Sequence, residues 1–245
     1  MKKQLLSIIT SVIILISVWG FTPPKQLSST DVIKKMYSRY HGKWHTSLTF
    51  TQTTGRYRND SLIKNDTWHE RIVYPDMLRI DFGDEKSGNG VIYRGDSSYS
   101  FRNNKVVRAA KDENELIFFL GGLYFKPLDQ VFTHFNELHF DLTKAHESTW
   151  KGKAVYVLGA ASDDEKVNQL WIDKKKLVAV RYFKYDPHGK MEATFEEHKL
   201  VGGAWSETFC KFIINDKLLQ TETYQDIKAN QPIDKSVFDP ALIGK

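Results

Sequence analysis

The residues that could carry chemistry are scattered along the chain and match no catalytic pattern. Cys210 is the sole cysteine, and its strand-like surroundings favour a packed thiol over a nucleophile. His41 and His45 are four residues apart, but Gly42 between them is expected to end a helix, so they share no helical face for a metal ion. The chain has no His-Glu-x-x-His, Cys-x-x-Cys or Gly-x-Ser-x-Gly motif.

Other polar groupings are equally poor candidates for a site. Glu196, Glu197 and His198 follow one another along a predicted strand, so their side chains alternate between its two faces. The Gly-Asn-Gly run at 88–90 is too short to cradle a phosphate. We therefore expect no catalytic residues, no metal and no cofactor. Three polar side chains converging in one cavity would revive the enzyme hypothesis.

A change of hydrophobic period divides the chain into helical and strand-forming parts. Residues 31–40 place apolar side chains at helical spacing, with Ser29 or Thr30 as the N-cap. From residue 44 the period becomes two, which indicates strands with one apolar and one polar face. Strands are predicted at 44–51, 68–74, 77–82, 91–93, 99–101, 105–107, 138–146, 154–158, 167–172, 177–185, 190–200, 205–214 and 218–227.

Short turns connect most of these strands, so neighbouring strands are expected to run antiparallel. No repeat, low-complexity run or linker divides them. A long meandering sheet must close on itself or be covered by helices to bury its apolar face. The predicted fold is therefore mostly β (α+β), an incomplete antiparallel β-barrel with helices covering the concave face.

The most apolar part of the chain after its N-terminus interrupts the strands at residues 113–135. Gly121 and Gly122 stand in its middle and weaken a helix by about 1 kcal/mol each. Such a segment could be a lid that moves when an acyl chain enters, or ordinary core in which the glycines shape a turn; the pattern leaves both open. As lid or cavity lining, the candidate ligand-binding residues are Trp44, Leu48, Phe50, Leu78, Phe82, Phe118, Phe119, Leu123 and Phe125.

The N-terminus has the layout of a secretory signal. Lys2 and Lys3 precede an uncharged apolar stretch from Leu5 to Phe21, and small residues stand near its end. We expect residues 1–20 to be a signal peptide, with an uncleaved anchor as the alternative. Residues 21–28 would then be a linker and residues 29–245 a single domain outside the cytoplasm, in the periplasm.

Charge argues against nucleic acid as a partner. The formal charge of +5 falls to +3 without Lys2 and Lys3, because residues 1–20 hold no acid. The remaining excess is spread thinly, whereas nucleic-acid binding uses a concentrated basic face.

Several motifs, in order, resemble the periplasmic lipoprotein carriers of the LolA-like family. The helix and strand at 31–53 end in Phe-Thr-Gln, and the block at 71–82 resembles the Arg-Pro-x-x-(Leu/Phe)-(Arg/Asn) hairpin of that family. A hairpin at 90–107, a meander at 169–200 and a closing Ile-Asp-Lys-Ser-Val-Phe run at 233–238 follow. The resemblance covers most of residues 30–240.

The resemblance implies a half-barrel carrier, 29–245, that shields the acyl chains of lipoproteins or another lipid. Its implied partners are acylated lipoproteins, an inner-membrane transporter and an outer-membrane acceptor, and we expect a monomer. In one respect this chain departs from the family, whose well-studied members have an Arg before the hairpin Pro that helps to latch the lid. Here that residue is Tyr74, which favours, as the alternative, a lipid-binding or envelope-stress sensor or adaptor module on the same fold.

Overall fold

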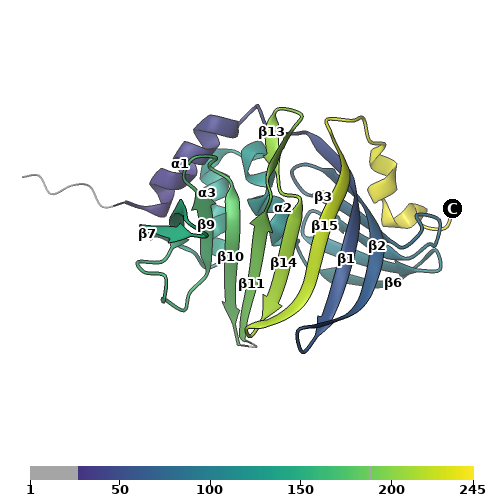
Figure 1. Ribbon diagram of the computed structural model, residues 1–245. Coiled ribbons are helices and arrows are strands. Elements are labelled where there is room, and N and C mark those ends of the chain that lie inside the picture. Colours follow the sequence, from purple (N-terminus) through teal and green to yellow (C-terminus); the bar gives the residue numbers. More distant parts are fainter. Residues whose placement is uncertain (1–26, 188) are drawn as a thin grey trace, which may run out of the picture.

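The computed structural model describes residues 27–187 and 189–245 and shows one large, curved antiparallel sheet (Figure 1). Its thirteen strands follow the order β6-β5-β4-β3-β2-β1-β15-β14-β11-β10-β9-β8-β7 and do not close into a barrel. The helices within residues 29–40 and 115–137 cover one face of the sheet and lie mostly toward its β7 end in Figure 1. The predicted mostly β fold, an incomplete antiparallel barrel with helices, is confirmed.

The first half of the sheet comprises β1 (Ser47–Arg58), β2 (Ser61–Val73), β3 (Met77–Phe82), β4 (Gly90–Arg94), β5 (Ser97–Arg102) and β6 (Lys105–Lys111). The second half comprises β7 (Asp141–Trp150), β8 (Lys153–Gly159), β9 (Gln169–Asp173), β10 (Ala179–Asp186), β11 (Gly189–Glu196), β14 (Phe209–Ile214) and β15 (Lys217–Ala229). A separate hairpin pairs β12 (Lys199–Val201) with β13 (Ala204–Ser206). The halves join where β1 pairs antiparallel with β15.

The helical segments are α1 (Ser29–Tyr40), α2 (Glu115–Phe119), the 3₁₀ turn η1 (Gly122–Phe125) and α3 (Leu128–Glu137). Ser28 caps α1 by accepting a hydrogen bond from the Asp31 N–H, one residue before the predicted caps. Short 3₁₀ turns η2 (Lys235–Phe238) and η3 (Pro240–Leu242) end the chain.

Several predicted boundaries were wrong for identifiable reasons. The first two strands continue into a long hairpin that turns at Asn59-Asp60, where both faces are largely exposed and apolar residues such as Leu62 and Ile63 do not alternate with polar ones. The predicted strand at 190–200 breaks at Glu197, whose φ of 52° interrupts the extended backbone. The strand predicted from residue 138 begins only at Asp141, because α3 continues to Glu137.

The main core lies between the helices and the concave face of the sheet. On α1 it includes the buried Val32, Ile33 and Met36, and on α3 the buried Val131 and Phe135. The side chains of Phe118, Phe119 and Phe135 pack as a group of rings with centroids 5.3–5.6 Å apart. This packing fixes the helices against the sheet by burying large apolar surfaces.

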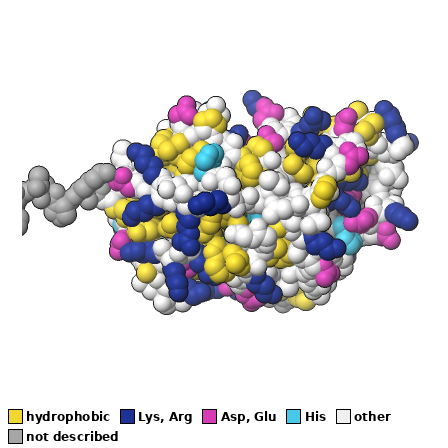
Figure 2. Space-filling model, turned by 90° about the horizontal axis from the view of Figure 1, so that it is seen from above, with side chains coloured by type: hydrophobic (Ala, Val, Ile, Leu, Met, Phe, Trp, Pro, Cys, Tyr) yellow, Lys and Arg dark blue, Asp and Glu magenta, His cyan; other side chains and the backbone are white. Residues whose placement is uncertain are grey.

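Charged side chains are distributed over the surface seen in Figure 2. On this face Lys and Arg are interspersed with acidic and hydrophobic side chains. Within the described residues, no helix is long and apolar enough to cross a membrane. The signal peptide predicted at 1–20 and most of the predicted linker at 21–28 lie outside the described residues.

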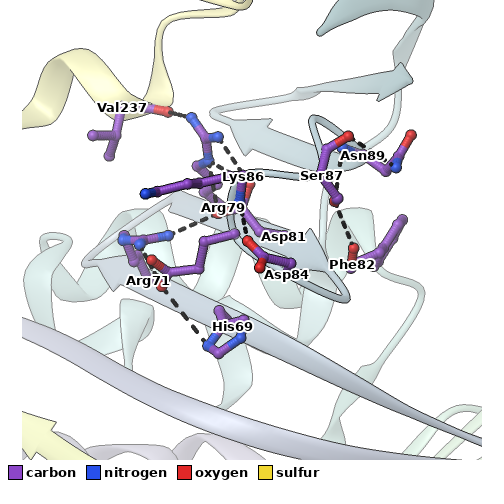
Figure 3. Close-up of polar contacts among 11 residues, drawn as sticks. His69, Arg71, Arg79, Asp81, Phe82, Asp84, Lys86, Ser87, Asn89 and Val237 are labelled. Carbon is purple, nitrogen blue, oxygen red and sulfur yellow. Dashed lines mark hydrogen bonds and ion pairs between the residues drawn. The ribbon is translucent and has the colours of Figure 1, made fainter. Parts of the chain in front are cut away.

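The C-terminal segment packs against the outer face of β3 to β5. Phe238 is fully buried against Ile92 and Phe101. Beside it, Arg79 forms an ion pair with Asp81 at 2.8 Å and donates a hydrogen bond to the carbonyl oxygen of Val237 at 2.9 Å (Figure 3). Arg71 also pairs with Asp81, at 2.7 Å, so the buried Asp81 carboxylate has two guanidinium partners.

Candidate functional site

A cavity of about 220 Å³ lies between the concave face of the sheet and the segment that contains α2. Strands β1, β2 and β3 form one wall, and residues from β11 to β15 form the other. The lining residues are Leu48, Phe50, Glu70, Ile72, Tyr74, Leu78, Ile80, Asn114, Leu116, Ile117, Leu120, Phe195, Glu207, Phe212, Glu222 and Tyr224. Most of this surface is aliphatic or aromatic, as in small-molecule sites generally.

Residues 114–125, which we call the lid, cover this cavity. The Asn114 side chain caps α2 by accepting a hydrogen bond from the Leu116 N–H at 3.1 Å. Glu115 accepts a hydrogen bond from the Tyr182 hydroxyl at 2.6 Å and forms an ion pair with Lys184. These contacts attach the start of the lid to β10.

Tyr74 attaches the other end of the lid to the sheet. Its hydroxyl donates a hydrogen bond to the carbonyl oxygen of Leu120 at 3.3 Å, and its ring stacks on Phe125 with centroids 5.6 Å apart. Tyr74, the residue before Pro75, is thus in direct contact with the lid. Arg71 lies on the opposite face, bound to Asp81 and Glu85.

The two glycines allow the lid to approach the sheet closely. A Cβ atom on Gly121 would overlap the Trp44 ring and the Tyr74 ring, and Gly121 has a φ of 154°. A Cβ on Gly122 would overlap the Pro75 carbonyl oxygen. The glycine pair therefore makes a tight packing contact between the lid and the sheet. The sequence alone did not decide whether these glycines form a flexible joint or shape a turn.

The predicted binding residues fall into three groups. Leu48, Phe50 and Leu78 line the cavity. Phe82 has the same strand parity but packs on Trp68, with ring centroids 4.8 Å apart, beyond the lining. Trp44, Phe118, Phe119 and Leu123 lie in the core around the lid, each at most 8% exposed, and Phe125 is 37% exposed on its outer side.

Sequence reasoning missed the three glutamates that also line the cavity. Glu70 lies on β2, Glu222 on β15 and Glu207 in the connection between β13 and β14. Their convergence depends on the pairing of β1 with β15, which joins the two ends of the chain. Strand parity was the available signal for Glu70 alone, because Glu70 lies on the same face of β2 as Trp68 and Ile72.

Burial makes these carboxyl groups poor acids. It raises the pKa of Glu207 to about 7, with a smaller contribution from the negative charge of Glu222. Burial also raises the pKa of Glu222, and raises that of Glu70 well above its ordinary value, with further repulsion from Glu222 and Glu207. The cavity therefore combines an apolar wall with three weakly acidic carboxyl groups, which is the convergence of polar side chains that keeps an enzyme as an alternative.

A second hollow, of about 340 Å³, lies beside β8 and β11 and has a mixed lining. Lys151, Lys153 and Lys176 stand there among Asp173, Glu196 and Glu197. Lys151 already pairs with Glu196 at 2.6 Å, so this hollow has no strong charge preference. In residues 27–187 and 189–245, no group of three or more His, Cys, Asp or Glu side chains is arranged to hold a metal ion.

Comparison with solved structures shows a LolA-like fold. A DUF1329 family protein from Desulfovibrio piger has a TM-score of 0.61 at 11% identity, over 88% of this chain and 97% of that one. A domain named as an outer membrane lipoprotein-sorting protein, from Vibrio parahaemolyticus, has a TM-score of 0.57 at 11% identity, over 88% and 98% of the two chains. A LolA superfamily protein from Nitrosomonas europaea has a TM-score of 0.54 at 9% identity, over 87% and 98%. No family model and no curated protein matches the sequence.

Proposed function

We propose that this chain, with its LolA-like fold, is a non-catalytic carrier of the cell envelope that holds the acyl chain of a lipoprotein or another lipid. The observation that carries the proposal is the cavity between sheet and lid, with Leu48, Phe50 and Leu78 on one wall and Leu116 and Leu120 on the lid. Burial of an aliphatic chain there contributes about 0.8 kcal/mol per methylene group.

The lid must move for a full acyl chain to bind. Ligand sites usually have volumes of about 300–1,000 Å³, whereas this cavity measures about 220 Å³. The described arrangement is therefore too narrow for a full acyl chain, and we propose that it is the closed form of the carrier. Its occupant enters as the lid separates from Tyr74.

The setting we propose follows from the fold and from the N-terminal residues. The carrier works in the periplasm as a monomer, receives its cargo from an inner-membrane transporter and delivers it to an outer-membrane acceptor. The alternative is a sensor or adaptor module on the same fold, with residues 1–20 retained as an anchor. Cell fractionation distinguishes the two, because the anchored module would be recovered with the membrane and the carrier with the periplasm.

Native mass spectrometry of the protein purified from its own envelope tests the carrier proposal. We expect a bound acylated polypeptide that is recovered chemically intact. Bound phospholipid would instead show a lipid binder, a chemically altered ligand would show an enzyme, and repeated recovery of empty protein would contradict all three.

A pair of matched variants locates the binding in the cavity. Leu78→Trp adds a ring to the cavity wall, where Leu78 is 4% exposed, whereas Val107→Trp adds the same ring at a position that is 61% exposed on β6. We expect Leu78→Trp to lower ligand occupancy by about tenfold, or about 1.4 kcal/mol, and Val107→Trp to leave it unchanged. A cooperative thermal unfolding transition in each variant is the check that both variants fold.

A further inference from the structure

Buried acids elsewhere in this protein have partners. Asp81 pairs with Arg71 and Arg79, and Glu192 pairs with Arg181 at 2.7 Å. Asp173 accepts hydrogen bonds from the backbone N–H groups of Lys175 and Lys176 at 2.8 and 2.7 Å. This is the usual arrangement, because an unpaired buried charge is costly.

The cavity glutamates differ from these buried acids. Glu70 is 7% exposed and lines the cavity, yet within the described part of the chain its carboxyl group has no hydrogen-bond donor and no ion-pair partner. Glu222 accepts hydrogen bonds from Gln220 at 2.6 Å and from the Tyr224 hydroxyl at 2.8 Å, both uncharged groups. No Lys, Arg or His is among the residues that line this cavity.

A buried acceptor next to the glutamates also lacks a hydrogen-bond donor. Gln52, which bonds Glu222, has a fully buried Oε1 atom that lacks a partner within residues 27–187 and 189–245. An ammonium group offers three donors and one positive charge. It would therefore supply the counter-charge that all three glutamates lack and the hydrogen bonds that Glu70 lacks.

We propose that the cavity recognises an aliphatic amine, with its ammonium group among Glu70, Glu207 and Glu222 and its chain along the apolar wall. This proposal rests on the proposed carrier function and names the class of its ligand. A ligand with a carboxylate or phosphate at that end is disfavoured by repulsion from each of these groups that is ionised. The chemistry is shared by a single-chain amino lipid and by the free α-amine of a diacylated polypeptide.

Three probes with the same twelve-carbon chain test this preference: dodecylamine, dodecanol and dodecanoate. The probes are titrated calorimetrically into the full chain at about pH 8, where Glu207 is mostly ionised. The amine should bind most tightly, the alcohol less tightly and the carboxylate most weakly. We expect the amine to bind at least about tenfold more tightly than the alcohol. Equal affinity for amine and alcohol would overturn the inference while leaving the carrier function intact, whereas failure of all three to bind would contradict both.

Variants show whether the glutamates cause the preference. Glu70→Gln with Glu222→Gln keeps side-chain size and removes the charges, so the amine should lose about tenfold in affinity while dodecanol binds as before. Glu85→Gln, on the outer face where the Glu85 side chain is 49% exposed, is the matched control and should keep the wild-type order. An amine preference that survives in the double variant would overturn the inference. The single variant Glu70→Gln, expected to show the same loss in smaller measure, replaces the double variant if the latter does not fold.

Two further probes distinguish the sources of the amine. A diacylated lipopeptide with a free α-amine and its N-acylated counterpart differ only in that charge, and sphingosine presents an amine without a polypeptide. Preference for the free-amine lipopeptide over both others assigns a lipoprotein source, and preference for sphingosine assigns an amino lipid. Equal binding of the free-amine and N-acylated lipopeptides, with no binding of sphingosine, would overturn the amine proposal.

Discussion

At the residue scale, the cavity glutamates couple protonation to stability. Burial raises the pKa of Glu207 from 4.5 to about 7, and the pKa values of Glu70 and Glu222 move in the same direction. Between these values the folded protein retains protons that the unfolded chain has released. The free energy of unfolding therefore falls as pH rises from about 4.5 through about 7.

Through these glutamates we predict that the free energy of unfolding loses roughly 1–3 kcal/mol between about pH 5.5 and about pH 8, against an opposing gain from His45 and His198, whose pKa values burial lowers. Glu207→Gln with Glu222→Gln should reduce this difference, measured by circular dichroism melts, whereas the exposed control Glu85→Gln should not. Tyr74, Tyr224 and Cys210 also face this region, but burial raises their pKa values above their ordinary values, so they stay neutral throughout. An unchanged pH difference in the double variant would refute this assignment.

Tyr74 is predicted to hold the lid closed. Tyr74→Phe removes the hydrogen bond to Leu120 and keeps the ring stacked on Phe125, which should cost about 1 kcal/mol of closed-lid stability. Stopped-flow measurement of dodecanol release should then show faster dissociation. Tyr99→Phe, on the outer face with the C-terminal segment, is the control and should not alter the rate. Identical release rates in the two variants would show that Tyr74 is not a latch.

At the element scale, the close contact between lid and sheet depends on Gly121. Gly121→Ala should destabilise the lid, because the new Cβ overlaps Trp44 and Tyr74, whereas Gly95→Ala changes a glycine that also has positive φ but has open space around it. We expect about 1–3 kcal/mol more destabilisation for Gly121→Ala. Hydrogen exchange should show faster amide exchange across residues 114–125 in that variant only; equal exchange in both would argue against a tightly packed lid.

The C-terminal turns stabilise the sheet from its outer face. Phe238 is fully buried there, so Phe238→Ala should lower the free energy of unfolding by about 3–5 kcal/mol in urea titrations. Dodecanol affinity measured on the folded variant should be unchanged, since the cavity lies on the other face. Loss of binding in protein that is still folded would show that the two faces are coupled.

Sequence periodicity predicted helices and strands correctly where the element has one apolar face. It placed α1 within two residues of its start, and it placed the turn between β2 and β3 at Pro75-Asp76. It could not find the polar ends of β1 and β2, because their exposure on both faces leaves no period to read. The break between α2 and η1 at Gly121 depends on contacts with Trp44 and Tyr74 that only the folded chain supplies.

At the scale of the whole molecule, the curved sheet has two free edges. The β6 edge carries Lys105, Arg108 and Lys111, and such charges discourage pairing with another sheet. The β7 edge is packed against α1 and α3. Both features fit the expectation of a monomer, which light scattering can test.

The cavity is a property of the whole fold. Leu48, Phe50 and Leu78 were predictable as lining residues, because strand parity alone turns them toward the concave face. The glutamates were not, since Glu70 and Glu222 meet only through the pairing of β1 with β15. Local patterns therefore indicate the apolar wall of the cavity, whereas the grouping of the glutamates on that wall depends on the order of the strands in the sheet.

The central claim is that an aliphatic chain binds between the sheet and the lid. Photolabelling with a twelve-carbon amine that carries a diazirine at the end of its chain, followed by peptide mass spectrometry, tests this directly. We predict covalent label on cavity residues such as Leu48, Leu78, Leu116 and Leu120, and less label when unlabelled dodecylamine competes. Label confined to the hollow near Trp150 and Lys153, or to the exposed surface, would contradict the account.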